Sequence, residues 1–325
     1  MPSRVKLVRE SYRIPSADAG IDLYVRNKRP QNKQHFRAEK ILLYLHGATY
    51  PAETAFDFPI GGGSWMDYIA RRGFDVYLMD VRGYGGSTRP PQMYAAAETS
   101  PPIADTATAI RDLNAVIEHI CARRKVEKIN LMGWSWGTSI MGAYTARNNH
   151  TVNKLVLYAP LWLGNSAFVS SAHGVQGAYR VVALDSIRER WLQGVPRDKT
   201  SDLIPAGVLE KWIKTTLATD PIGSKRNPPA LVVPNGAIKD LRDYWAKGVA
   251  YYDPGKITVP ALVAHAEWDH DLPSPVAQTF FSRLTQTRYK RYIEIGEGTH
   301  ALLLEKNRMQ LYHEVQLFLE QTAPE

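Results

Sequence analysis

Residues 128–137 read Lys-Ile-Asn-Leu-Met-Gly-Trp-Ser-Trp-Gly, an apolar stretch that runs directly into a Gly-x-Ser-x-Gly sequence around Ser135. The apolar part predicts a buried strand, and residues 138–147 (TSIMGAYTAR) predict a helix. Glycines on either side of the serine let the strand and the helix pass close to each other and permit a tight turn between them. The stretch therefore predicts that the Ser135 hydroxyl projects from the top of a sheet.

Two more predicted strands, both near the end of the chain, run into polar residues that suit the chemistry of a serine. Residues 291–295 lead into a Gly-Thr-His sequence that ends at His300, and residues 261–265 lead to Asp269. A serine hydroxyl is a weak nucleophile at neutral pH, so it needs a neutral imidazole to accept its proton, and a carboxylate orients that imidazole. We expect Ser135 to be the nucleophile, His300 the base and Asp269 the acid.

The order serine, acid, histidine, with each residue after the carboxyl end of a predicted strand, resembles the α/β-hydrolase family. Two further sequences extend the resemblance. His-Gly-Ala at 46–48 follows the predicted strand 41–45, where the family carries its oxyanion-hole loop, and DVRGYGGS at 80–87 is similar to the family's D-x-R-G-x-G-x-S loop. The resemblance covers residues 41–300. It implies an α/β fold with a mostly parallel sheet, helices on both faces and a helical cap inserted between core strands.

The resemblance also assigns roles around the serine. The backbone N–H groups of Ala48 and Trp136 would bind the developing oxyanion, while His46 would hold the turn of its loop. In the family an aspartate commonly lies four residues before a proline, as Asp269 does here. The sequence His-Gly-Ala-Thr at 46–49 is similar to the His-Gly-Ala of monoacylglycerol-lipase-like enzymes. It differs from the His-Gly-Gly-Gly of hormone-sensitive-lipase-like esterases and the His-Gly-Gly-Pro of proline iminopeptidases, which disfavours a peptidase.

Neighbouring residues leave alternatives open for two of these roles. His270 is the nearest rival for the base, and Glu267 or Asp271 are the rivals for the acid. Asp75 and Asp80 belong to an earlier strand and are expected to brace loops by hydrogen bonds.

Strand and helix alternate along most of the chain, but the alternation breaks between about residues 161 and 253, where large aromatic residues are frequent. Helices are expected in this stretch at 178–192, 208–217 and 238–249. We therefore divide the chain into an α/β core at 1–161 and 254–325 and a helical cap at 162–253. The residues expected to contact the substrate are Thr49, Trp134, Trp191, Trp212 and Trp245.

The remaining elements follow from apolar residues that recur with the period of a strand or of a helix. The expected strands are 5–12 and 21–25, which form an opening antiparallel pair, and 41–45, 74–79 and 154–159; the expected helices are 64–72, 106–123 and 307–319. Ser64 and Asp67 give the first of these helices a capping-box-like start.

Composition limits the classes of function. The 325 residues carry a net charge of +8 and have a pI of about 9.4, with the basic excess concentrated in residues 4–13, 26–40 and 123–125. No recognition motif for nucleic acid accompanies this charge, so no nucleic-acid partner is expected. We expect a solvated basic surface, with mild attraction of anionic substrates as the alternative.

No cofactor and no metal are expected, because no ligand spacing for a metal is present and the glycines at 61–63 lack the Lys-Ser/Thr of a phosphate loop. The first twenty residues contain no apolar signal region, and no apolar run approaches the roughly 20 residues that span a bilayer. These patterns predict a cytoplasmic protein. The single cysteine, Cys121, follows Ile117 and Ile120 on the apolar face of a predicted helix and is expected to belong to the core.

Together the patterns favour a serine hydrolase that cleaves carboxylic esters of small, partly apolar substrates through an acyl-enzyme. Cleavage of a lactone, an amide or a carbon–carbon bond, and acyl transfer, are alternatives on the same fold. Dehalogenases and the usual epoxide hydrolases need an aspartate where Ser135 stands. The non-enzymatic alternative is a ligand-binding receptor on a hydrolase scaffold.

Overall fold

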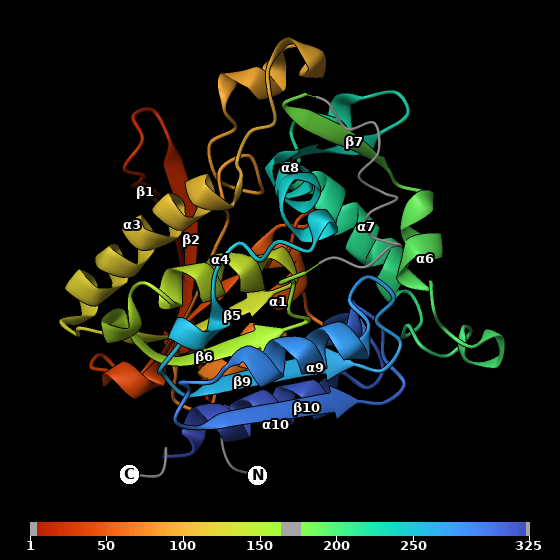
Figure 1. Cartoon of the computed structure of the whole chain (residues 1–325). Coiled ribbons are helices and arrows are strands. Elements are labelled where there is room, and N and C mark those ends of the chain that lie inside the picture. Colours follow the sequence, from red (N-terminus) through yellow and green to blue (C-terminus); the bar gives the residue numbers. More distant parts are fainter. Residues whose placement is uncertain (1–4, 164–176, 323–325) are drawn as a thin grey trace.

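The computed structural model describes residues 5–163 and 177–322. Within these ranges eight strands form one sheet in the order β1-β2-β4-β3-β5-β6-β9-β10 (Figure 1). Its strands are β1 (Leu7–Pro15), β2 (Asp22–Pro30), β3 (Ile41–Leu45), β4 (Asp75–Met79), β5 (Ile129–Trp134), β6 (Val152–Tyr158), β9 (Ala261–Ala266) and β10 (Lys290–Ile295). Strand β2 pairs antiparallel with both of its neighbours, and the other pairs are parallel. The predicted mostly parallel sheet is confirmed.

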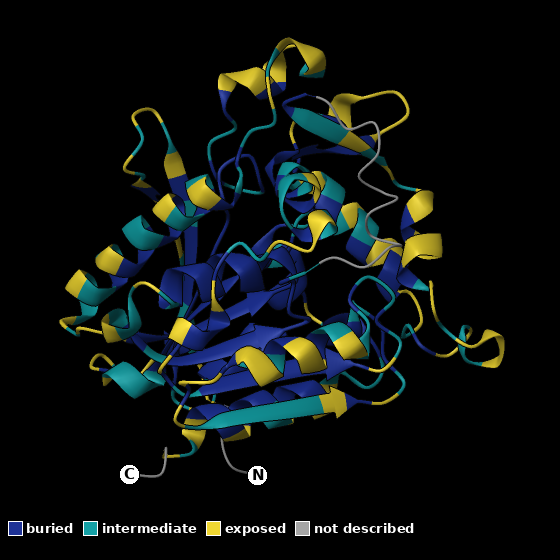
Figure 2. Ribbon diagram, in the orientation of Figure 1, coloured by how far each residue is buried: buried dark blue, intermediate teal, exposed yellow. Residues whose placement is uncertain are grey.

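Helices cover both faces of this sheet (Figure 1). One face carries α3 (Thr106–Arg124), α4 (Trp136–Thr145) and α9 (Ser274–Arg283), and the other carries α2 (Trp65–Ala70) and α10 (Arg308–Glu320), while the short α1 (Ala52–Phe56) follows β3. Strands β3, β4, β5 and β9 are buried along their whole length (Figure 2). Their near-continuous apolar sequences suit strands that are covered on both sides.

Local sequence explains where the helices begin. Ser64 and Asp67 form the predicted capping box of α2, because the Ser64 hydroxyl accepts from the Asp67 N–H and the Asp67 carboxylate accepts from the Ser64 N–H. The side chain of Asp105 caps α3 by accepting from the Thr108 N–H at 3.0 Å. Cys121 of α3 is partly buried and packs against the core. No helix in the described ranges is both long and apolar enough to cross a membrane.

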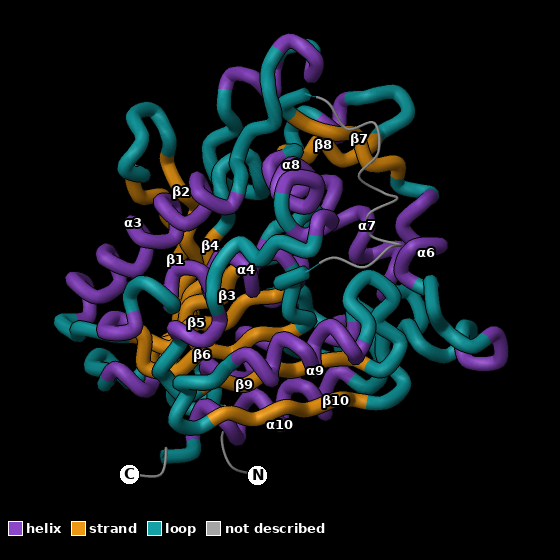
Figure 3. Tube along the Cα trace, viewed as in Figure 1, coloured by secondary structure: helices purple, strands orange, loops and turns teal. Residues whose placement is uncertain are grey.

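The elements described between β6 and β9 form a separate group, which lies at the carboxyl ends of the parallel strands (Figure 1). They are β7 (Tyr179–Ala183), α6 (Ser186–Trp191), α7 (Val208–Ala218), β8 (Ala230–Pro234) and α8 (Gly236–Asp243). Strands β7 and β8 pair antiparallel and form a small second sheet (Figure 3). The helix expected at 208–217 is confirmed by α7.

Two expected helices of this stretch are wrong in part. The helix expected at 178–192 begins as the strand β7, because Val181 and Val182 are β-branched and pair with β8, about 50 residues further along the chain. Sequence reasoning did not identify β8. The helix expected at 238–249 starts at Gly236 and ends at Asp243, and a separate 3-10 turn follows at Trp245–Lys247.

The expectation of a solvated basic surface is wrong for the start of the second basic stretch, residues 26–29, whereas Arg37 further along it is exposed. Arg26 and Arg29 are buried, and Arg26 forms ion pairs with Glu53 and Asp57 at 2.8 Å. Lys28 also contacts Asp57, at 2.5 Å. The side chains on one face of β2 point to helices rather than to water, so their charges are matched by carboxylates.

The crossing of β5 and α4 is as close as the flanking glycines predict. A Cβ atom on Gly133 would lie 2.5 Å from the carbonyl oxygen of Gly137, and one on Gly137 would lie 2.5 Å from the carbonyl oxygen of Leu45. Real Cβ atoms do not approach backbone oxygens so closely. Only glycine therefore fits at either position.

Gly137→Ala is expected to lower the free energy of unfolding by about 3 kcal/mol, because the added methyl group overlaps the backbone of β3. Urea unfolding followed by circular dichroism measures the change. Gly63→Ala is the control, since the nearest atom there is the end of the flexible Arg71 side chain at 3.1 Å. A loss below about 1 kcal/mol is expected for the control, and equal losses in the two variants would show that the crossing is not tightly constrained.

Candidate active site

Ser135 occupies the turn between β5 and α4 in a strained conformation. Its φ of 55° and ψ of −122° lie outside the regions that residues with a side chain prefer. Backbone hydrogen bonds hold it there, because its N–H donates to the Tyr158 carbonyl at 3.0 Å and its own carbonyl accepts from the Thr138 N–H at 2.8 Å. Ser135 lines a cavity of the described structure. Such strain is typical of functional turns that the surrounding structure enforces.

His300 and Asp269 lie in loops after β10 and β9 and contact each other. The His300 Nδ1 and the Asp269 Oδ2 are 2.8 Å apart. Asp269 is buried, and its other oxygen accepts from the Leu272 N–H at 2.9 Å. Because a carboxylate only accepts, Nδ1 carries the proton of the neutral ring, which leaves Nε2 unprotonated.

The backbone of His300 is fixed to the ends of β5 and β6. Its carbonyl accepts from the Trp134 indole N–H at 3.0 Å and from the Tyr158 hydroxyl at 2.9 Å. The Trp134 and His300 rings also pack together, with centroids 5.5 Å apart. Trp134 immediately precedes Ser135, so these contacts bring the histidine loop next to the serine turn.

The rival residues have other contacts. Asp271 forms an ion pair with Arg190 at 3.0 Å, and Glu267 accepts from the Glu297 N–H at 2.9 Å. His270 lines the cavity. Of the three acids that the sequence offered, Asp269 is the one hydrogen-bonded to the His300 ring.

Charge and burial act in opposite directions on the pKa of His300. Burial of the ring disfavours the charged form, but the negative charge of Asp269 and its hydrogen bond outweigh burial, so the pKa lies above its ordinary value. An imidazolium at this position is therefore stabilised by the carboxylate behind it.

His46 holds the loop that follows β3. Its Nε2 accepts from the Val81 N–H at 3.1 Å, so the proton is on Nδ1, which donates to the Gly47 carbonyl at 2.6 Å. Burial lowers the pKa of His46 to about 4, which keeps the ring neutral. A Cβ on Gly47 would lie 3.1 Å from the Ser135 Cβ. The predicted role of His46 is confirmed, and the loop it holds lies against the serine.

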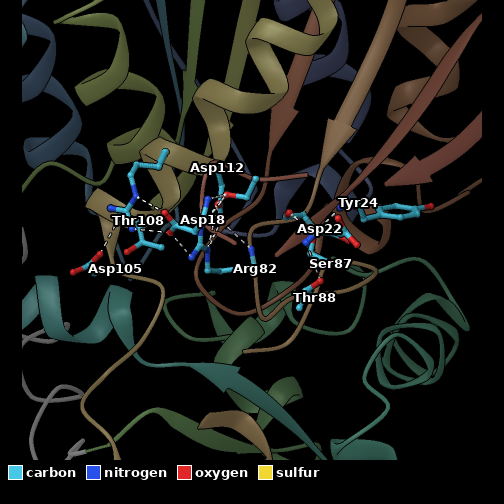
Figure 4. Close-up of polar contacts among 12 residues, drawn as sticks. Asp18, Asp22, Tyr24, Arg82, Ser87, Thr88, Asp105, Thr108 and Asp112 are labelled. Carbon is cyan, nitrogen blue, oxygen red and sulfur yellow. Dashed lines mark hydrogen bonds and ion pairs between the residues drawn. The ribbon is translucent and has the colours of Figure 1, made fainter. Parts of the chain in front are cut away.

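The loop at 80–87 is itself fixed by polar side chains. The Asp80 carboxylate accepts from the N–H groups of Ala52 at 2.8 Å and Gly86 at 3.0 Å, so its predicted bracing role is confirmed. Arg82 lies between Asp18 and Asp112 and pairs with both (Figure 4).

On the other side of the same loop, Ser87 and Thr88 accept from the N–H groups of Tyr24 and Asp22, at 2.8 and 2.9 Å (Figure 4). The loop is thereby tied to β2 and α3, and it presents Val81 to His46.

A cavity of about 460 Å³ opens above Ser135 and His300. Its walls come from the loop after β3, the serine turn, the loops after β9 and β10, and the group of elements between β6 and β9. Four of the five residues expected to contact substrate line it: Thr49, Trp134, Trp191 and Trp212. The fifth, Trp245, is buried in the 3-10 turn after α8 and is not among the residues of the wall.

The two tryptophans of the wall are rigidly held. The Trp191 indole N–H donates to the buried carboxylate of Glu305, and that of Trp212 donates to the Thr54 carbonyl, each at 2.8 Å. Their rings meet edge to face with centroids 5.2 Å apart. Hydrogen bonds to two separate segments of the chain therefore fix the shape of the apolar wall.

Of the proposed oxyanion donors, Ala48 lines the cavity, whereas the side chain of Trp136 is buried and donates to the Thr106 hydroxyl at 2.9 Å. The Ala48 carbonyl accepts from the Tyr84 hydroxyl at 2.9 Å and from Arg180 at 2.8 Å, which fixes the orientation of its peptide group.

Among the cavity residues that sequence reasoning missed, two are charged, Arg180 and Arg190. Nothing distinguished them among the 40 lysines and arginines of the chain. No group of three or more His, Cys, Asp or Glu in the described ranges could hold a metal ion.

The sequence matches a family described as the alpha/beta hydrolase fold over residues 40–307. This match covers more than half of the chain, and the protein belongs to that family. Bovine Protein ABHD8 is 23% identical over 312 residues, which cover 92% of this chain and 64% of that protein. The chain therefore spans less than two thirds of the length of this relative.

Solved structures share the fold. A thermophilic esterase from Thermogutta terrifontis superposes with a TM-score of 0.64 at 16% identity, covering 95% of this chain and 98% of that chain. The 2-hydroxy-6-oxo-6-phenylhexa-2,4-dienoate hydrolase from Rhodococcus sp. strain RHA1 gives a TM-score of 0.63 at 14% identity, covering 96% and 99%. At these identities the likeness establishes the fold, and the reaction has to be argued from the site.

Titration of the His300 ring by nuclear magnetic resonance is expected to give a pKa above the ordinary histidine value. Asp269→Asn should lower this pKa below that of the wild type, because the negative charge is removed while burial of the ring remains. Glu267→Gln should leave it unchanged. An unaltered His300 pKa in Asp269→Asn would show that this carboxylate is not the electrostatic partner of the ring.

Proposed function

We propose that this protein is a serine hydrolase that cleaves carboxylic esters through an acyl-enzyme, with Ser135, His300 and Asp269 as its catalytic triad. One observation carries the proposal: the strained serine turn and the hydrogen-bonded His300–Asp269 pair open onto the same cavity. A strained serine alone, or a buried His–Asp pair alone, would not indicate a reaction. Next to each other at a cavity they supply a nucleophile and its base.

The reaction follows from the tautomer of His300. The Ser135 hydroxyl attacks the ester carbonyl while the unprotonated Nε2 of His300 accepts its proton, and the Asp269 charge stabilises the imidazolium that forms. The backbone N–H groups of Ala48 and Trp136 bind the oxyanion. The imidazolium then protonates the departing alcohol. A water molecule, deprotonated by the same imidazole, hydrolyses the acyl-enzyme and regenerates Ser135.

The elements between β6 and β9 act as a cap in this proposal. Trp191 of α6 and Trp212 of α7 form an apolar wall of the cavity, and the cavity volume of about 460 Å³ suits a small ligand. The cap would thus select the size and polarity of the substrate, while the core carries out the reaction.

A fluorophosphonate probe is expected to label the protein once, at Ser135, and Ser135→Ala should abolish labelling and reduce ester turnover by about 10³-fold or more. Mass spectrometry of the labelled peptide identifies the site. Ser186→Ala is the control, since Ser186 also lines the cavity but its hydroxyl donates to the Ala183 carbonyl. Labelling that persists in Ser135→Ala would contradict the assignment.

The same purified protein distinguishes the alternatives. Turnover of lactones or anilides but not of 4-nitrophenyl esters, lost in Ser135→Ala, would replace the ester assignment by another bond on the same triad. Absence of both labelling and turnover would favour the alternative that the protein is a ligand-binding receptor on a hydrolase scaffold.

Trp212→Leu or Trp191→Leu should lower kcat/KM for 4-nitrophenyl octanoate about tenfold more than for the acetate. A long acyl chain loses methylene contacts worth about 1–3 kcal/mol, whereas the acetate does not reach these rings. Trp245→Leu is the matched control, because it removes a buried tryptophan that lies outside the cavity wall. An unchanged octanoate-to-acetate ratio in both wall variants would exclude these tryptophans as determinants of chain length.

A further inference from the structure

Arg180 of β7 reaches from the cap to the oxyanion-hole loop. Its guanidinium donates to the carbonyls of Pro234 at 2.7 Å and Ala48 at 2.8 Å, and to the Thr49 hydroxyl at 3.1 Å. The side chain is also part of the cavity wall, together with Ser135. Every one of these partners is a neutral oxygen, so the positive charge of Arg180 is hydrogen-bonded but not neutralised.

No carboxylate of the described residues lies within ion-pair distance of Arg180. Residues 164–176, which precede β7, contain no Asp or Glu. Among the described residues that line the cavity, the charged side chains are Arg180, Arg190 and Asp271, and Arg190 pairs with Asp271. The side chains of the cavity wall therefore carry two positive charges and one negative charge, and the Asp269 carboxylate lies behind the wall, against the His300 ring.

Arg180 differs in this respect from the other buried arginines of the described structure. The buried Arg26, Arg29 and Arg82 each contact at least one carboxylate at 2.8 Å or less. The partly buried Arg124 does so too, and Arg89 lies 3.8 Å from the Asp220 carboxylate. Lys154, a buried cation that contacts only carbonyls, lies at the negative C-terminal end of α10. Arg180 has no such compensation, since Pro234 precedes the positive N-terminal end of α8.

An uncompensated charge that is partly withdrawn from water is costly. Burial accordingly lowers the pKa of Arg180. A guanidinium has five N–H donors, and a hydrogen bond to a carboxylate is about twice as strong as one to a neutral oxygen. An anionic group that enters the cavity would therefore be preferred over the Thr49 hydroxyl as a partner, and it would give Arg180 the carboxylate contact that it lacks.

We propose that Arg180 binds a carboxylate of the substrate, and that the natural substrates are small esters that carry this second, negatively charged group. The proposal rests on the proposed ester hydrolysis and names its substrate class. Arg180 contacts the loop that would hold the oxyanion, so the carboxylate lies within a few bonds of the ester that is cleaved. The apolar wall of Trp191 and Trp212 then contacts the remainder of the substrate.

Two matched pairs of esters test the proposal, one for each side of the scissile bond. On the acyl side, 4-nitrophenyl hemiglutarate is compared with the 4-nitrophenyl ester of glutaramic acid. On the alcohol side, 4-acetoxybenzoate is compared with 4-acetoxybenzamide. The measured quantity is the ratio of kcat/KM for the anionic ester to that for the neutral amide. Any loss of activity common to both members of a pair cancels in this ratio.

In at least one pair the wild-type ratio is expected to exceed the Arg180→Gln ratio by about tenfold or more, since the charge-assisted bond is lost. Arg180→Lys keeps the charge and should restore part of the ratio. High salt should reduce the wild-type ratio. Arg188→Gln, on the same helix as Arg190 but outside the cavity wall, is the control and should match the wild type.

Ratios that are equal in wild type and Arg180→Gln for both pairs, with hydrolysis still proceeding, would overturn the carboxylate proposal and leave the serine hydrolase intact. Binding to Ser135→Ala, measured by calorimetry with the same esters, separates the two proposals. Tighter binding of the anionic member, lost in Ser135→Ala/Arg180→Gln, supports the carboxylate site even if the wild type hydrolyses none of these esters. Equal binding of both members overturns it.

Discussion

The close crossing of β5 and α4 is the constraint on which the rest of the site depends. Gly133 lets the backbones of β5 and α4 approach to a distance that no side chain would allow, and Gly137 does the same for α4 and the end of β3. Ser135, midway between them, is held at φ of 55° and ψ of −122°, a conformation that a serine does not adopt by preference. Packing of the surrounding core offsets the free energy of this strain, because α4 is buried along its whole length and β5 lies in the middle of the sheet.

The loops around this crossing are held by hydrogen bonds between buried groups rather than by apolar packing alone. His46 joins the loop after β3 to the loop at 80–87, and Trp134 with Tyr158 joins the histidine loop to β5 and β6. A buried polar group that loses its partner is costly, so such a network permits few alternative arrangements. Loops from distant parts of the chain can in this way be positioned with the accuracy that the proposed proton transfer needs.

Charge is distributed differently in the core and in the cavity. In the N-terminal part of the sheet, the buried Arg26 and the partly buried Lys28 of β2 contact carboxylates, which stabilises the charges where they are withdrawn from water. At the cavity, Arg190 follows the same rule with Asp271, but Arg180 does not. An unmatched charge beside a reactive group is more informative about ligands than the net charge of the whole chain, because most of that net charge is exposed to solvent and screened.

The sequence by itself determined the fold class, the strand–turn–helix around Ser135 and the strand ends that carry Asp269 and His300. These features depend on local patterns, namely apolar strands, flanking glycines and capping residues, whose physical effect extends over a few positions. The sequence could not choose by geometry among Glu267, Asp269 and Asp271, which are too close along the chain for their order to separate them. The structure distinguishes them, because the His300 ring is hydrogen-bonded to Asp269.

Only the tertiary structure decided what depends on contacts between distant residues. The first part of the helix expected at 178–192 is instead the strand β7, because pairing with β8, about 50 residues away, outweighs a local preference. The same docking brought Arg180 into the cavity wall and left Trp245 outside it. Neither placement follows from residue type or spacing. Arg180 lies 45 residues after Ser135 and Trp245 lies 110 residues after it, and nothing in the sequence around either residue indicates whether its side chain faces the serine.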